Sequence, residues 1–225
     1  MKANLRICLG AAILAIGVSG CASHTLEPFA YNSAWPPGQG AGTRKIGVRV
    51  YGETFVNEEE KGLSLPALRL WLEQTAKAYD ESGLFAGVEC TSIKADPETG
   101  IPVGSDDGIG NVDLHADVQI IERQRVNWTM AVLTGLTVYI IPSRVTSDVT
   151  VKTTVRDNKG KVLGEFTTSN SVITWQQIFL VAVMPFSYPP TVEKQAIFDL
   201  NRLALIEMND KGVLVPTPPA KAKTK

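Results

Sequence analysis

The segment 145–174, VTSDVTVKTTVRDNKGKVLGEFTTSNSVIT, decides the fold. Its first half alternates between valines and polar residues, which is the pattern of a β-strand with one buried face. The residues DNKG at 157–160 are typical of a tight hairpin turn, and the chain from Val162 onward is again rich in β-branched residues. The segment therefore predicts two long antiparallel strands, 145–156 and 162–174.

The flanking segments predict the remaining elements. Residues 46–50 and 112–120 alternate in the same way and predict two further half-buried strands. A helix is predicted to begin at Ser64, a favoured N-cap residue, and to end at Gly83, a favoured C′ residue. Its apolar stripe comprises Leu65, Leu68, Leu72, Ala76 and Tyr79. A second helix, 191–208, follows two prolines.

The order of these elements is strand, helix, three strands, helix, and residues 91–111 read as a loop. We therefore expect one α+β domain spanning residues 44–210. Its antiparallel sheet would have about four strands, packed by the two helices.

Two apolar inserts interrupt this pattern. The first, WTMAVLTGLTVYIIP at 128–142, joins two predicted strands, and the second, WQQIFLVAVMPF at 175–186, follows the last strand. In an antiparallel meander these strand ends lie at one edge of the sheet, so the inserts are expected side by side. Each insert is too short for a helix that crosses a bilayer, which needs about 20 apolar residues.

The inserts have two interpretations. They are either a small core that covers the sheet edge or an exposed apolar platform that contacts a partner or a membrane. Tryptophan and tyrosine suit a boundary between apolar and wet surroundings, as the second interpretation requires, and the sequence leaves both interpretations open. The candidate contact residues are Trp128, Leu133, Leu136, Tyr139, Trp175, Phe179 and Phe186.

The first residues of the chain read as an export signal. Lys2 and Arg6 precede an uncharged apolar run, LGAAILAIGV at 9–18, and residues 1–20 are therefore predicted to be a signal peptide. The alternative at the cleavage site is an ordinary signal peptide followed by an incidental cysteine. The residues VSGC at 18–21, however, resemble the lipobox of bacterial lipoproteins.

The lipobox resemblance implies acylation of Cys21, which would become the first mature residue and anchor the protein in the lipid bilayer. Ala22 and Ser23 follow, with no aspartate, a pattern that implies the outer membrane as location, with the domain facing the periplasm. Prolines and glycines predict that residues 21–43 are a flexible tether behind the lipidated N-terminus. Residues 211–225 are predicted to be a disordered tail rich in proline and lysine.

Composition excludes several classes of function. The chain has 22 lysines and arginines against 23 acidic residues, and removal of residues 1–20, which hold two cations, leaves 20 against 23. A chain with this slight excess of acidic residues is not expected to attract nucleic acid electrostatically. The histidines, His24 and His115, are too few for a histidine-rich metal site, and no nucleophile or phosphate-binding motif occurs. We therefore expect no enzymatic activity, no cofactor and no metal.

The predicted elements resemble a loose group of bacterial envelope lipoproteins: penicillin-binding-protein activators, the curli secretion lipoprotein and auxiliary lipoproteins of transport systems. The resemblance rests on the strand KIGV at 45–48, the helix end SGLF at 82–85, the strand ADV at 116–118, the hairpin 155–162 and the closing helix. It implies a non-catalytic component of the cell envelope that binds an unknown protein or lipid partner or acts as a scaffold. The alternative is a lipid-handling accessory subunit of an envelope transport system. The two inserts depart from the group's pattern.

Overall fold

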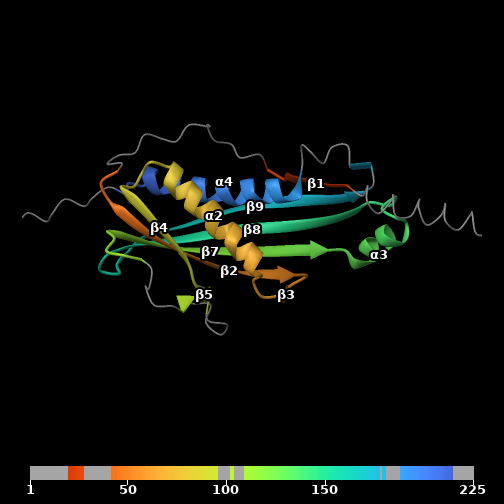
Figure 1. The fold of residues 1–225 in the computed structure, drawn as a ribbon, viewed down its shortest axis with the longest axis horizontal. Helices are drawn as coiled ribbons and strands as arrows, with labels where there is room; N and C mark the ends of the chain where they lie inside the picture. The colour runs from red at the N-terminus through yellow and green to blue at the C-terminus, as the bar shows by residue number, and fades with distance from the viewer. Residues whose placement is uncertain are drawn as a thin grey trace, which may run out of the picture.

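The computed structural model describes residues 20–27, 42–95, 102–103, 109–177, 179–180 and 188–214. Within them a mixed seven-stranded sheet packs against helices on one face (Figure 1). The elements in chain order are β1 (Gly20–Thr25), β2 (Lys45–Val56), β3 (Glu59–Glu60), α2 (Leu65–Glu81), β4 (Gly87–Ser92), β5 (Lys94–Ala95), β6 (Pro102–Val103), β7 (Leu114–Val126), α3 (Trp128–Leu136), β8 (Ser143–Asp157), β9 (Val162–Gln177) and α4 (Pro189–Asp210).

The sheet has the order β1-β9-β8-β7-β2-β3, and β4 pairs with the first half of β2. The α+β class and the antiparallel β7–β8–β9 meander agree with the sequence prediction. The expectation of about four antiparallel strands was wrong. The sheet is larger, and β2 runs parallel to both β4 and β7.

The parallel pairing of β2 with β4 arises because α2 is the crossover of a β2-α2-β4 unit. The helix carries the chain back to the start of β2, and β4 then runs beside β2 in the same direction, on the side away from β7. The crossover helix has the predicted ends: the Ser64 hydroxyl accepts from the amide of Ala67 at 3.3 Å, and Gly83 follows with φ of +64°. Strand β4 occupies residues 87–92, partly within the stretch expected to be a loop.

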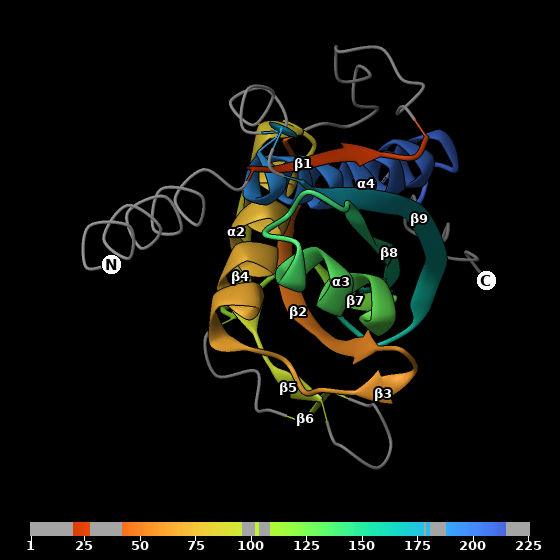
Figure 2. The ribbon, with the colours of Figure 1, turned by 90° about the vertical axis from the view of Figure 1, so that its right-hand side faces the viewer.

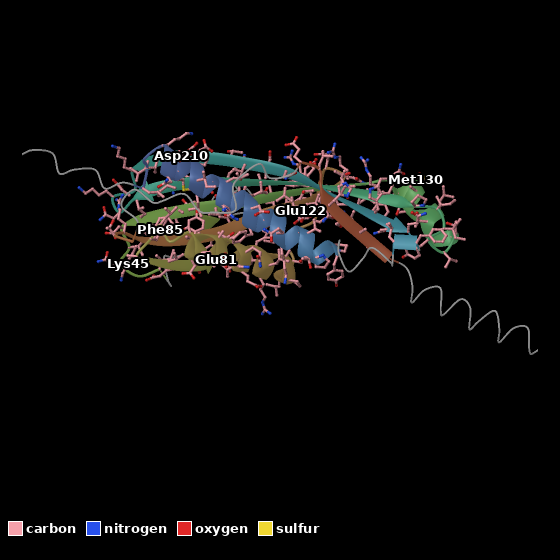
Figure 3. The ribbon with its side chains drawn as sticks, turned by 90° about the horizontal axis from the view of Figure 1, so that it is seen from above. Lys45, Glu81, Phe85, Glu122, Met130 and Asp210 are labelled. Atoms are coloured by element: carbon pink, nitrogen blue, oxygen red, sulfur yellow. The ribbon has the colours of Figure 1, made fainter. Side chains whose placement is uncertain are left out.

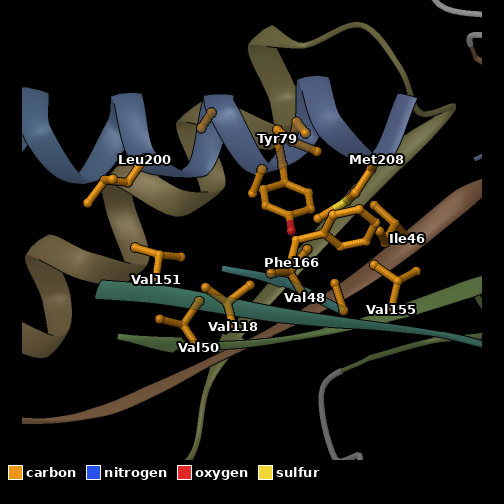
Figure 4. Close-up of a cluster of buried hydrophobic side chains, with 14 of the residues drawn as sticks. Ile46, Val48, Val50, Tyr79, Val118, Val151, Val155, Phe166, Leu200 and Met208 are labelled. Carbon is orange, nitrogen blue, oxygen red and sulfur yellow. The ribbon is translucent and has the colours of Figure 1, made fainter. Parts of the chain in front are cut away.

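The core lies between the helices and one face of the sheet (Figure 4). Ile46, Val48 and Val50 of β2 point into it, together with alternate residues of β7 and β8 and with Tyr79, Phe166, Leu200 and Met208. The buried face of α2 differs from the predicted stripe. Trp71, Thr75 and Ala78 are buried, whereas Leu65 is 71% exposed.

Close packing of α2 depends on Gly52 in β2. A Cβ atom at this position would lie 1.9 Å from the carbonyl oxygen of Ile120 and 2.7 Å from the Trp71 ring. Only a residue without a side chain permits this approach, since real Cβ contacts do not fall below about 3 Å. Gly52 therefore fixes how Trp71 sits over the sheet.

On the face away from the helices, the Asp117 carboxylate joins three strands. Its side chain is 5% exposed, accepts from Arg49 Nε at 2.6 Å, and forms an ion pair with Arg156. Each of the three residues lies on a different strand: β2, β7 and β8. A buried carboxylate is tolerated when it is paired and hydrogen-bonded in this way.

The two ends of the chain differ in part from the predicted boundaries. Residues 20–25, which reach into the expected tether, form β1 along the edge of β9. Leu214 is buried in the core, so the domain continues past residue 210 into the predicted tail. The remainder of the predicted signal peptide, tether and tail, residues 1–19, 28–41 and 215–225, lies outside the described residues.

Candidate functional site

Helix α3 lies at one end of the elongated molecule, beyond the region that α2 and α4 cover (Figures 1 and 3). Its N-terminus is held firmly. The Asn127 side chain caps it by accepting from the amide of Met130 at 3.1 Å. The Asn57 side-chain amide extends the sheet beside it, donating to the carbonyl of Val126 at 3.0 Å and accepting from its amide at 2.8 Å.

The apolar stripe of α3 faces outward. Trp128, Val132 and Leu136 follow one another at i, i+4 spacing and are 64, 58 and 76% exposed. The buried residue of α3 is instead Thr134, whose hydroxyl donates to the carbonyl of Met130. A surface helix ordinarily turns its apolar stripe to the core. This helix is inverted, and residues 128–142 carry no charged side chain.

The turn after α3 keeps apolar residues exposed at a conformational cost. The amide of Tyr139 bonds to the carbonyl of Thr134 at 2.7 Å and that of Val138 to Gly135 at 3.2 Å, which is a Schellman motif. The C′ residue of this motif, with φ of +51°, is Val138. The helices α2 and α4 place Gly83 and Gly212 at the corresponding position. Because β-branched residues strongly disfavour the left-handed region, the α3 turn is strained.

The second insert joins the first at this end, as the meander predicts. Trp175 lies within β9 and pairs with Arg144 of β8, whose guanidinium carbon is 6.0 Å from the centroid of the Trp175 ring. Trp175 is partly exposed, and Phe179, two residues beyond β9, is largely exposed. We call the exposed apolar side chains of residues 128–140, with Trp175 and Phe179, the apolar end.

Figure 2 views the molecule from this end, with α3 in front of the curved sheet. At the foot of α3 lies a cavity of about 660 Å³, whose walls come from β7, β8, β9 and the helix. Its lining is mixed in polarity: Asn57, Arg125, Val126, Asn127, Met130, Pro142, Ser143, Arg144, Thr146 and Trp175. Two arginines thus stand directly behind the apolar end.

The two arginines differ in their partners. Arg125 forms an exposed ion pair with Asp148 at 2.5 Å. Arg144 is exposed, and no carboxylate among the described residues lies within ion-pair distance of it. Its guanidinium lies instead over the Trp175 ring.

The predicted lipidation site lies at the same end of the sheet. Cys21 is the strand partner of Gln176, and Gln176 is also the partner of Ser143, so the three residues form one row across β1, β9 and β8. With strands about 4.8 Å apart, Cys21 lies about 10 Å from the strand that leaves the α3 turn. Ser23 strengthens this pairing with a 2.6 Å hydrogen bond to Thr174.

The structure brings together most of the predicted contact residues. Trp128, Leu133, Leu136, Trp175 and Phe179 are exposed and Tyr139 is half-buried, whereas Phe186 lies outside the described residues. Val132, Ile140, Arg125 and Arg144 belong to the same surface but were not predicted. The helical spacing from Trp128 points to Val132, but nothing in the sequence marks the arginines.

Another cavity, of about 270 Å³, lies near the start of α4 and is lined in part by two carboxylates, Glu122 and Glu193. Burial, followed by the charge of Glu122, raises the pKa of Glu193 to about 7. Burial likewise raises the pKa of the Cys90 thiol to about 12 and, to a smaller extent, that of Cys21. A raised pKa is the opposite of what a cysteine nucleophile requires.

Within the described residues, no three histidine, cysteine, aspartate or glutamate side chains converge as metal ligands. The helices of that part of the chain are also too short or too polar to cross a membrane. The fold and site thus define an α+β domain with a mixed sheet and one uncharged apolar end.

No family model and no curated protein matches this chain. Among solved structures, it is similar to a minor lipoprotein from Acinetobacter baumannii, with a TM-score of 0.39 and 10% identity over 75% of this chain and 91% of the other. It is also similar to a proposed homologue of a neuraminyllactose-binding hemagglutinin from Helicobacter pylori, with a TM-score of 0.39 and 8% identity over 84% and 98%. Both likenesses are weak and assign no activity.

Proposed function

We propose that this protein is a lipid-anchored, non-catalytic component of the bacterial cell envelope, which contacts an envelope partner through its apolar end. The anchor is the acylated Cys21, in the outer membrane, and the domain faces the periplasm. The observation that carries the proposal is the inverted helix α3, which exposes Trp128, Val132 and Leu136. Contiguous exposed apolar surface marks a contact with a protein or a membrane.

Conformational cost supports the same conclusion. A valine in the left-handed region costs about 1–3 kcal/mol, and such strain is typical of functional segments. A glycine at position 138 would remove the strain, but it would also remove an apolar side chain from the contact surface.

The charged and amide side chains in the mixed lining of the 660 Å³ cavity favour contact over lipid handling. An acyl-chain carrier needs a groove lined mainly by apolar side chains. The cavity behind the apolar end is instead lined by two arginines and two asparagines beside Trp175 and Met130.

The anchor is tested by replacing the cysteine. In cells given labelled palmitate, the wild-type protein is expected to carry label and to fractionate with membranes. The Cys21→Ser protein is expected to carry no label. Equal labelling of the two proteins would disprove the anchor.

The contact surface is tested by chemical protection. A cysteine placed at Val132 is expected to be shielded from maleimide in intact cells but reactive in the purified protein. A cysteine at Thr167, an exposed polar position of β9, is the matched control and should react in both samples. The unsubstituted parent corrects for Cys90. Equal reactivity of position 132 in cells and in solution would contradict the proposed contact.

A further inference from the structure

We infer that the apolar end docks onto the same phospholipid bilayer that holds the acylated Cys21, and that lipid phosphates bind at Arg144 and Arg125. This inference rests on the proposed function and names the partner of its contact surface. It would orient the molecule with its long strands rising from the membrane.

The first argument is position. Cys21, Gln176 and Ser143 share one row of the sheet, and α3 lies directly beyond that row. Acyl chains leave Cys21 toward the bilayer, so the residues beside it reach the membrane surface without any further movement. Since Cys21 is already paired within β1, no free segment separates the anchor from the folded domain.

The second argument is the layering of chemistry. Trp128, Val132, Leu136 and Ile140 form an uncharged outer layer, and α3 is about 13 Å long, which suits a short helix lying in the interface. Trp175 lies behind this layer, where an aromatic side chain meets the headgroup region. Arg144 lies in the same row of the sheet as Trp175, its cross-strand partner, and Arg125 pairs with Thr146, two residues further along β8. All of these side chains line the cavity.

The third argument is charge. Arg144 has no carboxylate partner among the described residues and stacks on Trp175. Arg125 forms an ion pair with Asp148, and its side chain is exposed. A planar guanidinium binds phosphate oxygens through parallel hydrogen bonds, and a cation near an anionic membrane surface adds about fivefold to binding.

The test uses the acylated protein reconstituted in vesicles of phosphatidylethanolamine and phosphatidylglycerol. A fluorescent probe is attached to a cysteine at Leu136, and in a separate protein at Lys159, in the exposed turn at the opposite end of the sheet. We expect quenchers carried by lipid chains to quench the probe at 136, and aqueous quenchers to reach the probe at 159. The protein without an introduced cysteine, labelled in the same way, corrects for dye attached to Cys90.

Charge is tested in the same system. Arg144→Gln should lower the equilibrium constant for docking about fivefold, obtained from the lipid quenching at position 136, with the protein still anchored. Lys152→Gln, which removes a cation from the middle of the same sheet face, should leave quenching unchanged.

The outcomes separate the two proposals. If the protein is acylated and vesicle-bound while position 136 is as accessible to water as position 159, the docking inference is overturned and the lipid anchor stands. A protein that carries no acyl group and does not stay on vesicles would overturn both.

Discussion

Arg144 lies over the indole ring of Trp175, 6.0 Å from guanidinium carbon to ring centroid, and links the strands β8 and β9 where the two apolar inserts leave the sheet. Exposed cation–π pairs contribute about 0.5–1 kcal/mol. A double-mutant cycle with Arg144→Ala and Trp175→Ala should therefore give a coupling free energy of that size in urea unfolding. The matched cycle with Arg125→Ala in place of Arg144→Ala should give none. Additive effects in the first cycle would contradict the contact.

Gly52→Ala should destabilise the fold strongly, by more than about 3 kcal/mol, because the new Cβ would lie 1.9 Å from the carbonyl oxygen of Ile120. Gly87→Ala is the control, since its Cβ would meet only the Lys45 side chain, at 3.8 Å. Chemical denaturation of both variants measures the difference. A Gly52→Ala protein as stable as Gly87→Ala would show that α2 does not pack closely over β2.

Asp117→Asn should cost about 2–3 kcal/mol of unfolding free energy, because it removes the charge that two partly buried arginines share. Asp148→Asn serves for comparison: its partner Arg125 is exposed, and exposed ion pairs contribute less than about 1 kcal/mol. Urea unfolding at pH 7 distinguishes the two. Equal losses would mean that the three-strand junction adds nothing.

Glu193 makes stability depend on pH. Its pKa is raised to about 7 in the folded protein, above the value of about 4.3 expected when unfolded. The folded state therefore binds more protons between these values, and its stability should fall by about 1 kcal/mol as pH rises from 4.5 to 7.5, after allowance for solvent screening. Glu193→Gln should flatten this dependence, whereas Glu207→Gln, in the exposed pair with Lys211, should not. The measurement is the melting temperature across this pH range.

Val138→Gly should strengthen the turn after α3, because glycine adopts the left-handed conformation without strain. Amide exchange at Tyr139, whose N–H bonds to the carbonyl of Thr134, should slow about fivefold, corresponding to ~1 kcal/mol. Val132→Gly places the same change inside the right-handed helix and should speed exchange there. Faster exchange at Tyr139 in the Val138→Gly protein would contradict the assigned strain.

Local patterns predicted the elements whose structure is decided locally. The β8–β9 hairpin was correct because alternation and the turn at Asp157–Gly160 agree, and α2 was correctly bounded by Ser64 and Gly83. The sequence GCASHT in β1 has no apolar alternation, and in GVECTS of β4 the alternation is limited to Val88 and Cys90, which is too short to predict a strand. Parallel pairing of β2 with β7 depends on tertiary crossover, which no local pattern encodes.

The limits at the candidate site have a similar cause. An uncharged segment such as residues 128–142 fits equally well in a core and on a contact surface. Its composition therefore does not predict whether its apolar side chains face the core or the solvent. Its exposure depends on the inward position of Thr134, which turns Trp128 and Leu136 to the outside. Arg144 became part of the site only through its pairing with Trp175, a residue 31 positions later in the chain.

The strand β1 gives the attachment at Cys21 a mechanical character. From Cys21 to Thr25 its residues pair with Gln176 through Val172 in antiparallel register, and antiparallel hydrogen bonds lie perpendicular to the strands. A force on Cys21 along the strand axis therefore acts in shear on all the β1–β9 hydrogen bonds at once. These bonds would have to break together and could not break one at a time. An acylated Cys21 would hold the domain as a rigid mount, and tension from the envelope would pass straight into β9 and the sheet.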